Sequence, residues 1–330
     1  MPQSSDPAWV EVTRGSLVES RHAVSYCVWR KGEIVRAAGD LERPVIYRSA
    51  AKPFQAIQVF ESGAPDRFGF SDEESAMVVG SHDGSPHHAA TARSMLAKIG
   101  VSADLLRCGG HRPLDRRVYE QYVRDGYEWG RIEDNCSGKH SGMIAAAVAH
   151  GEDPASYADG DHPGQQRNLA NMALFTGVPE EDIVLGIDGC AVPCFAVPLA
   201  NMARAIAHFA TPDCVPGALA QSVARIRDVV RAHPEMVAGP RRFDTVVMRA
   251  TGGRLLSKEG AEGVVTIGVA DEQTGIAIKI HDGGQRALNA FAAALLCDLD
   301  LVDAAAVAAW HPRTIDSRAG DPVGEVRMIL

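Results

Sequence analysis

The stretch "YRSAAKPFQ" places a serine hydroxyl, Ser49, three residues before a lysine amine, Lys52. A serine oxygen is a poor nucleophile unless a base removes its proton, and a neutral lysine amine can be that base. Lysine is rare in this chain: of its 33 basic residues, six are lysines and 27 are arginines. Arginine keeps its proton in proteins, whereas a desolvated lysine can lose it. The pattern therefore indicates a place where a neutral amine is needed.

A helix that begins just after Ser49 would bring the two groups together. If Ser49 caps that helix, the side chains at i and i+3 share one face, and Pro53 fits its first turn. The unpaired N–H groups of the helix start can stabilise an oxyanion. Arg48 adds a positive neighbour, which favours the neutral form of a lysine. A capped helix with an ordinary surface lysine is the alternative interpretation.

A second stretch, "GSHDGSPHH", holds Ser81, His82 and Asp83, followed by His87 and His88. Glycines on both sides allow the backbone to approach a ligand closely. Immediate neighbours in an extended chain point in opposite directions, so three consecutive residues make a poor Ser-His-Asp triad. The histidine pair is a possible metal site, although a polar loop is the commoner meaning of such a pair.

Two further stretches carry thiols. "NCSGKHSGM" contains Cys136, Lys139 and His140, and "GIDGCAVPC" contains Cys190. The two thiolates, together with Lys139 or His140, have the donor atoms of a zinc site, although 54 positions separate the cysteines. Buried structural cysteines are one alternative, and a Cys136–His140 nucleophile pair is another.

A fifth stretch, "LLSKEGAEGVV", contains Lys258. Its glycines predict a turn around this lysine, followed by a strand. A second lysine in a glycine-rich segment strengthens the view that Lys52 has a chemical task.

The elements that must position these residues follow a simple order along the chain. "WVEVTRGS", "AVSYCVWR" and "EIVRAA" are typical of strands, the last two joined by the hairpin "RKGE". Residues 49–232 have the apolar spacing of helices. The final part returns to the strands "DTVVMRA", "GVVTIGVA" and "GIAIKIHD", followed by the helix "GQRALNAFAAALLCDL".

This order predicts an α+β fold, in which N- and C-terminal strands form one mixed antiparallel sheet beside a helical middle region. We expect a single domain over residues 1–330. Its sheet lobe would comprise approximately residues 8–48 and 240–330, and its helical lobe residues 49–239.

Composition narrows the class of protein. The chain has 330 residues, of which 46% are hydrophobic and 23% charged, as in soluble globular proteins. A formal charge of −9 disfavours nucleic acid and anionic membrane surfaces as partners. No secretory signal or membrane-spanning apolar run is evident. Seven cysteines, an odd number, favour reduced thiols in the cytoplasm.

Taken together, these motifs resemble two families. The pattern echoes the S-x-x-K, S-D-N and K-T-G set of penicillin-binding proteins and class A β-lactamases, with departures in the second and third elements. "YRSAAKPFQ", "GSHDG", "NCSGKHSGM", "DGC" and "KEGAEGV" are more similar to the rhizobial-type (class 3) L-asparaginases, from about residue 10 to the C-terminus. That resemblance implies a serine β-lactamase/glutaminase-like fold, a homodimer, and hydrolysis of L-asparagine to L-aspartate and ammonia.

The resemblance also implies roles for individual residues. Ser49 would be the nucleophile and Lys52 its base, with Ser81 and Lys258 as a second serine–lysine pair. A zinc ion beside the substrate pocket would be held by Cys136, Lys139 and Cys190. The expected substrate-binding residues are Arg48, His82 and Asp188.

The chain departs from the family pattern in the Ser81 loop. Asp83 stands where a serine is expected, and Ser85 where a glutamate is expected. We expect the zinc to tune substrate binding rather than to generate the attacking hydroxide, because a serine nucleophile is present. A glutaminase or β-lactam-directed enzyme on the same fold is the nearest alternative, and a non-catalytic zinc-binding module is the other.

Overall fold

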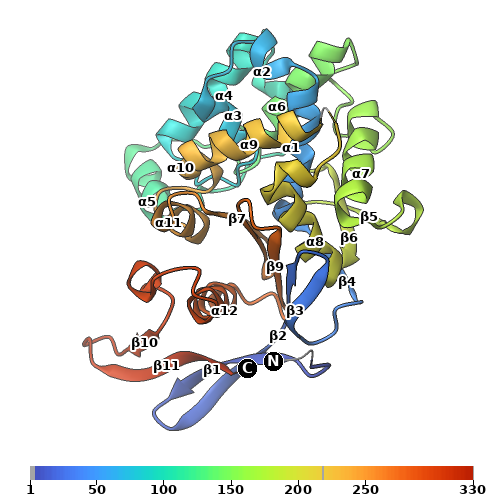
Figure 1. Ribbon diagram of the computed structural model, residues 1–330. Coiled ribbons are helices and arrows are strands. Elements are labelled where there is room, and N and C mark those ends of the chain that lie inside the picture. Colours follow the sequence, from blue (N-terminus) through green and yellow to red (C-terminus); the bar gives the residue numbers. More distant parts are fainter. Residues whose placement is uncertain (1–3, 218, 330) are drawn as a thin grey trace. The chain divides into compact units, whose positions relative to one another are not determined.

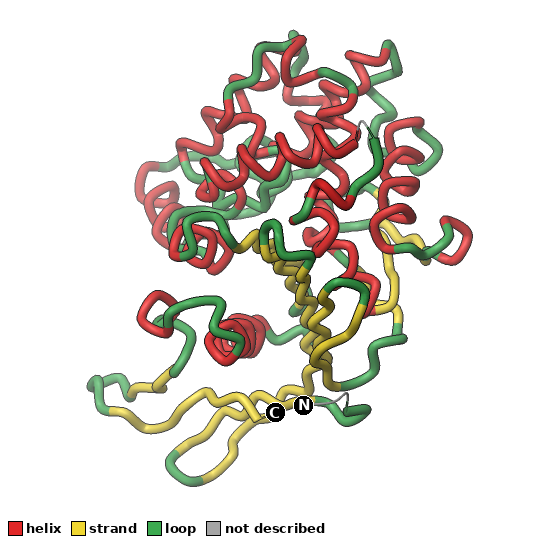
Figure 2. The backbone as a smooth tube through the Cα atoms, in the orientation of Figure 1, coloured by secondary structure: helices red, strands yellow, loops and turns green. Residues whose placement is uncertain are grey.

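A computed structural model describes residues 4–217 and 219–329. The chain divides into two compact units. Strands dominate the first unit, which comprises residues 1–50, 196–211 and 246–330, and helices dominate the second, which comprises residues 51–195 and 212–245 (Figure 2). No helix within the described ranges has the length and apolar character needed to cross a bilayer.

The first unit is built on an antiparallel sheet in the order β10-β11-β1-β2-β9-β8-β7, with β3 pairing to β2 (Figure 1). β2 pairs with β9 from Val24 opposite Ile280 to Arg30 opposite Thr274, and the N-terminal strands β1 and β2 lie between strands from the C-terminal part of the chain. The predicted α+β class is therefore confirmed. The strands are β1 (Ala8–Arg14), β2 (Leu17–Arg30), β3 (Glu33–Ala38), β7 (Leu255–Gly260), β8 (Val264–Val269), β9 (Thr274–Ile280), β10 (Arg313–Asp316) and β11 (Pro322–Ile329).

Two helices cover opposite faces of this sheet, α8 (Leu199–Ala210) and α12 (Gln285–Asp298). Gly275 of β9 lies against α8 so closely that a Cβ there would be 2.0 Å from the Ala203 carbonyl oxygen. On the other face, Tyr26 of β2 packs on Phe291 of α12 with ring centroids 5.3 Å apart. The alternation of side chains along each strand buries both faces.

The second unit is a helical assembly around α1 (Lys52–Glu61), which packs against α6, α7 and α9. Phe54 of α1 meets Phe175 of α7 with ring centroids 5.4 Å apart. The other helices of this unit are α2 (Ala64–Arg67), α3 (Asp72–Met77), α4 (Pro86–Ile99), α5 (Arg116–Asp125), α6 (Ser137–His150), α7 (Pro163–Thr176), α9 (Leu219–Ala232) and α10 (Pro234–Val237).

Short segments complete the two units. In the first unit β4 (Pro44–Ile46) pairs with the end of β6 (Pro193–Pro198), Val45 lying opposite Val197. β5 (Val184–Ile187) belongs to the second unit. The 3-10 helices are η1 (Arg48–Ala51), η2 (Ala103–Leu105), η3 (Glu180–Asp182), η4 (Pro212–Cys214) and η5 (Ala304–Val307).

One predicted strand is wrong. The segment "DTVVMRA" forms helix α11 (Phe243–Ala250). Phe243 and Val247, four residues apart, are both buried, as are Asp244 and Met248. This spacing belongs to a helix face, but the short run of β-branched residues favoured a strand when read alone.

Candidate active site

Lys52 is the first residue of α1 and is 1% exposed. Its Nζ donates hydrogen bonds to Ser81 Oγ at 2.9 Å, to Cys136 Sγ at 3.2 Å and to the Gly80 carbonyl oxygen. Three acceptors match the three N–H groups of a lysine ammonium. If the amine is neutral, the Ser81 hydroxyl or the Cys136 thiol can donate to it instead. The arrangement can therefore hold a proton and exchange it between three side chains.

Glycines on α6 explain how residues so far apart in sequence meet. A Cβ on Gly138 would lie 2.5 Å from the Met77 carbonyl oxygen, and one on Gly142 would lie 2.9 Å from a Val78 methyl group. The end of α3 therefore packs directly on the α6 backbone. This contact brings the loop that contains Ser81 to the start of α6, where Cys136 stands.

Ser49 is not a helix cap, contrary to prediction. It is half-buried in η1, and the residue that precedes α1 is Ala51, with helical φ −77° and ψ −15° and no side-chain cap. The chain already turns before Ser49, because the Ala50 N–H bonds to the Tyr47 carbonyl at 3.1 Å. The 3-10 helix η1 ends at Ala51, and Lys52, which follows it, begins α1 of the second unit.

Arg48, the predicted substrate-binding residue, begins this turn with φ +49°. A positive φ is uncommon for a residue with a Cβ and stores strain, which often occurs at functional sites. The conformation turns the chain sharply just before Ser49.

Lys258 lies on strand β7, not in the predicted turn, which is formed by the residues after Gly260. It is 2% exposed, and its Nζ donates to the Glu259 carbonyl at 2.7 Å. A Cβ on Gly260 would be 2.6 Å from the Tyr47 carbonyl oxygen. Residues two apart on a strand share a face, so Lys258 points to the side on which η1 lies. The first unit thus holds Ser49 and Lys258 on neighbouring segments.

Cys136, Lys139 and Cys190, the predicted zinc ligands, form a buried cluster in the second unit. Lys139 Nζ lies 3.0 Å from Cys190 Sγ. The hydrogen bond donated by Cys136 lowers the pKa of Cys190, and the Lys139 charge lowers it further against the effect of burial. Burial opposes the charge on Lys139, yet the Cys190 and Cys136 sulfurs raise its pKa. These opposite pKa shifts favour a Cys190 thiolate beside a Lys139 ammonium.

A buried relay that sequence reasoning missed supports this thiolate. The Tyr157 hydroxyl oxygen accepts the Arg107 N–H at 2.8 Å, so its own proton faces His140 Nδ1 at 2.5 Å. Burial and the nearby Lys139 lower the pKa of His140 to about 4, so the ring is neutral. The nearby His140 ring lowers the pKa of Cys190, while its Nε2 is buried and makes no hydrogen bond within the described residues. Tyr157 stands in an ordinary loop sequence that gives no motif signal.

The Ser81 loop contains no Ser-His-Asp triad, in line with the sequence argument. His82 Nδ1 accepts the Gly84 N–H at 3.1 Å, and Nε2 bonds to Ser137 Oγ at 2.9 Å. Burial, followed by positive neighbours, lowers the pKa of His82 well below its usual value. Asp83 instead packs on Gly239, where a Cβ would lie 1.8 Å from its Oδ2.

Asp188 stands at the exposed side of the thiol cluster. It is half-buried, and its Oδ1 accepts the Gly189 N–H at 2.6 Å. Its negative charge contributes to the raised pKa of Lys139. A carboxylate here can receive a positively charged part of a ligand.

Two sets of side chains have donors for a metal. The sulfurs of Cys136 and Cys190 are of the donor type that zinc prefers, whereas the Lys139 nitrogen can bind a metal only after it loses its proton. The ligand atoms of Glu73, His233 and Glu235 lie within 4.8 Å of one another on a partly exposed surface.

The adjacent histidines His87 and His88 have separate partners. His87 pairs with Glu73 at 3.2 Å, and His88 stacks on His82 with ring centroids 4.9 Å apart.

Comparisons with known proteins complete the description. The family model described as L-asparaginase II matches residues 10–328. No curated protein matches the chain. Among solved structures, Mglu in its tris and glutamate form is 12% identical, with 84% of this chain and 59% of that chain covered and a TM-score of 0.40. This chain thus spans 59% of the length of that protein. A putative beta-lactamase from Bacteroides dorei is 15% identical, with 79% and 86% covered and a TM-score of 0.41.

Proposed function

The chain belongs to the L-asparaginase II family, and from this premise we propose that it hydrolyses L-asparagine to L-aspartate and ammonia. The family assignment makes it an amidohydrolase on a serine β-lactamase/glutaminase-like fold. One observation in particular supports a serine–lysine mechanism for this reaction. The buried amine of Lys52, three residues after Ser49, is hydrogen-bonded to a second serine, Ser81.

In the first half of the reaction, Ser49 Oγ attacks the side-chain amide carbon while Lys52 takes the hydroxyl proton. The tetrahedral oxyanion accepts hydrogen bonds from N–H groups at the start of the helical segment. The proton then passes to the amide nitrogen, the C–N bond breaks, and ammonia leaves. A β-aspartyl ester on Ser49 remains.

In the second half, water attacks the ester carbon. We assign the proton of that water to Ser81, a role supported by its 2.9 Å hydrogen bond with Lys52, and we assign Lys258 as the second amine of proton transfer. The C–O bond to Ser49 breaks, aspartate leaves, and the proton returns to the serine oxygen. Three exchangeable protons around Lys52 make this return possible without a large movement.

The charged ends of asparagine require partners of opposite sign. We assign Arg48 to the substrate carboxylate and Asp188 to its ammonium group. We assign His82 to the wall of the substrate site, which it shapes without adding charge, because its ring is neutral and both ring nitrogens are bonded to Gly84 and Ser137.

We propose zinc as an accessory ion at Cys136, Lys139 and Cys190. Bound there, zinc would supply a fixed positive charge that orients the substrate's polar groups. Lys139 must lose its proton to bind a metal, so binding releases protons. We expect chelation to raise KM while kcat at saturating asparagine stays within about twofold. Complete loss of turnover would instead make zinc part of the chemistry. Unfolding on chelation would favour a non-catalytic zinc-binding module.

The test of the proposed function is ammonia release from L-asparagine by the wild type, Ser49→Ala and Ser81→Ala. We expect release by the wild type, none from Ser49→Ala, and a reduced rate from Ser81→Ala. Equal release by the wild type and Ser49→Ala, with loss in Ser81→Ala, would move the nucleophile to Ser81. No release from any form would refute the proposed substrate. L-glutamine in the same assay measures specificity, because one methylene is worth only about 1–3 kcal/mol.

We also propose a homodimer in the cytoplasm, as the family resemblance and the cysteine count suggest. Val184, Leu185 and Ile187 of β5 are 58%, 52% and 72% exposed, an apolar surface that suits an interface between subunits. Sedimentation equilibrium distinguishes a dimer from a monomer, and Leu185→Glu should shift the equilibrium toward monomer. An unchanged dimer in that variant would place the interface elsewhere.

A further inference from the structure

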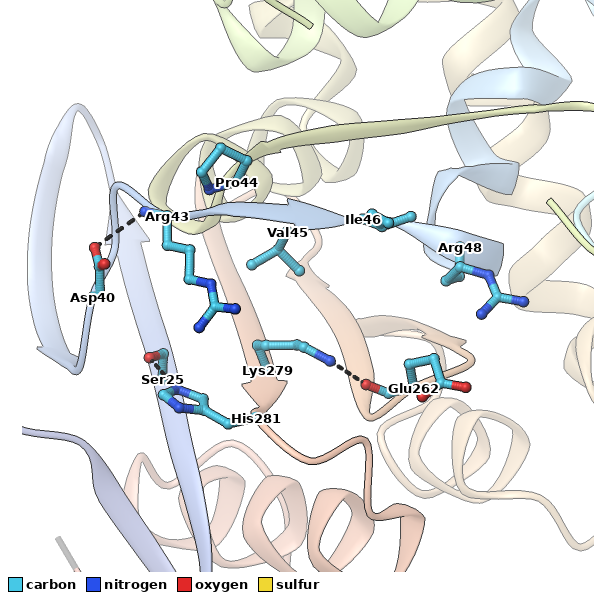
Figure 3. A pocket seen from close by; sticks show the side chains of 10 residues that line it. All are labelled: Ser25, Asp40, Arg43, Pro44, Val45, Ile46, Arg48, Glu262, Lys279 and His281. Atoms are coloured by element: carbon cyan, nitrogen blue, oxygen red, sulfur yellow. Dashed lines mark hydrogen bonds between the residues drawn. The ribbon is translucent and has the colours of Figure 1, made fainter. Parts of the chain in front are cut away.

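The first unit contains a pocket of about 280 Å³ (Figure 3), and of its lining residues the proposed reaction uses only Arg48. Its wall is formed by β9 and by the loop between β3 and β4. Pro44, Val45 and Ile46 give it an apolar side. The volume suits a small metabolite rather than a peptide or a nucleic acid.

Positive groups converge on this pocket, and their partners there leave several of their N–H groups unused. The guanidinium of Arg43 points into it above Lys279 and His281 (Figure 3). Within residues 4–217 and 219–329, the Arg43 side chain has no hydrogen bond or ion pair. Lys279 Nζ donates to the Glu262 carbonyl oxygen, which uses one of its three N–H groups.

The cations also act on one another. Burial lowers the pKa of Lys279, and Arg43 lowers it further against the opposing charge of Glu262. Burial likewise lowers the pKa of His281, and Arg43 and Lys279 add to the effect. Mutual repulsion of this kind is relieved when an anion enters.

The pocket wall is fixed by the fold. Asp40 Oδ1 accepts the N–H groups of Glu42 and Arg43 at 3.0 and 3.1 Å, which sets the backbone from which Arg43 projects. Gly39 lies so close to β2 that a Cβ would be 2.2 Å from Ser25 Oγ. Ser25 Oγ in turn bonds to His281 Nε2 at 2.8 Å. The loop is therefore positioned before any ligand arrives, which lowers the cost of binding.

We propose that this pocket binds a small oxyanion, a carboxylate or a phosphate monoester, between Arg43 and Lys279. The planar guanidinium offers two parallel N–H donors to such a group, and the lysine adds a point charge. The acidic groups on the wall do not occupy this position. Asp40 is engaged by its own loop, and Glu262 extends over Gly283, where a Cβ would be 2.7 Å from its Oε2. Arg48 lines the rim with its guanidinium directed away from Arg43 (Figure 3).

Calorimetric titration of the full chain with inorganic phosphate, glycerol phosphate and acetate tests the proposal. Arg43→Ala should weaken binding at least about tenfold, the fold-change for loss of one charge-assisted hydrogen bond. Arg14→Ala, an exposed arginine of the same unit that pairs with Glu19 at 3.5 Å, is the matched control and should bind like the wild type. Lys279→Gln should weaken binding in the same direction.

The three probes separate the two sources of the anion. Tighter binding of glycerol phosphate than of acetate assigns the pocket to phosphate monoesters, and the reverse order assigns it to carboxylates. Equal binding by Arg43→Ala and the wild type would overturn the proposal, as would equal weakening in Arg43→Ala and Arg14→Ala. Absence of saturable binding of all three probes would overturn it as well.

Discussion

Lys52 and Lys279 show how the same side chain serves different purposes in the two units. Lys52 is 1% exposed, and all three contacts of its amine are acceptors from its own chain. Lys279 is only half-buried, has one such acceptor, and otherwise faces Arg43 and His281. Around Lys52, a proton can move only between the amine and its buried hydrogen-bond partners. The second leaves positive charge available to something from solution.

The difference lies in what surrounds the amine rather than in the amine itself. A buried lysine without acceptors would be costly, so Ser81 and Cys136 are needed for Lys52 to be there at all. Those same groups are the ones that can return a proton to it. Around Lys279, the like charges raise the cost of the empty pocket and thereby favour an anion. Four substitutions test how the two units hold their side chains.

The largest effect is expected from removing the amine at each place. Lys52→Met should lower ammonia release from L-asparagine by about 10²–10⁴-fold, the usual contribution of a general base. Lys279→Met, the matched control, should change it by less than about twofold. Steady-state kinetics at saturating asparagine give the comparison. Similar losses in both variants would mean that Lys279 belongs to the reaction.

Gly260→Ala tests how η1 and the strand of Lys258 are held together in the first unit. The added Cβ would meet the Tyr47 carbonyl oxygen at 2.6 Å, so we expect a loss of about 1–3 kcal/mol in unfolding free energy. Gly130→Ala, which has open space around the new Cβ, is the control. Chemical denaturation measures both. A Gly260→Ala protein as stable as the control would contradict the close packing.

Asp83→Asn tests the buried carboxyl beside Gly239. Burial raises its pKa to about 6, above the value near 4 of an unfolded chain. The native state therefore binds the proton more tightly, and this group's contribution to stability is lost as pH rises from about 4 to 6. Relative to Asp83→Asn, the wild type should lose about 2–3 kcal/mol over that range. Parallel stability curves for the two proteins between pH 4 and 7 would disprove it.

Tyr157→Phe tests the relay that supports the thiol cluster, with the smallest expected effect. Loss of the hydroxyl leaves His140 Nδ1 without its donor and frees the ring to change tautomer. We expect the affinity for the proposed zinc ion to fall about 10-fold, the lower end for loss of a group that orients metal ligands. Tyr122→Phe removes another buried hydroxyl, which bonds the Gly84 carbonyl at 3.1 Å, and should leave affinity unchanged. Equal zinc affinity in Tyr157→Phe and the wild type would show that the relay does not reach the metal ligands.

Residue types and local spacing were enough to predict several features of this protein. Periodicity predicted the strands at both ends and the helical middle, because the spacing of apolar side chains shows which face of an element is buried. The S-x-x-K segment was identified from its residue types. Three local predictions were wrong, and the third is Lys258, which lies on strand β7 rather than in a turn. "DTVVMRA" is too short for its period to outweigh its β-branched residues, and the cap assigned to Ser49 required knowing that the turn begins at Tyr47.

The contacts between residues that are distant in the sequence could not be predicted and became clear from the packing of the fold. Lys52 reaches Cys136 because Gly138 and Gly142 let the end of α3 lie on α6, and no local pattern states that two helices will pack there. Tyr157 beside His140 is likewise a product of packing. Such contacts join residues tens of positions apart, and their geometry depends on the sum of many weak packing terms rather than on any one residue.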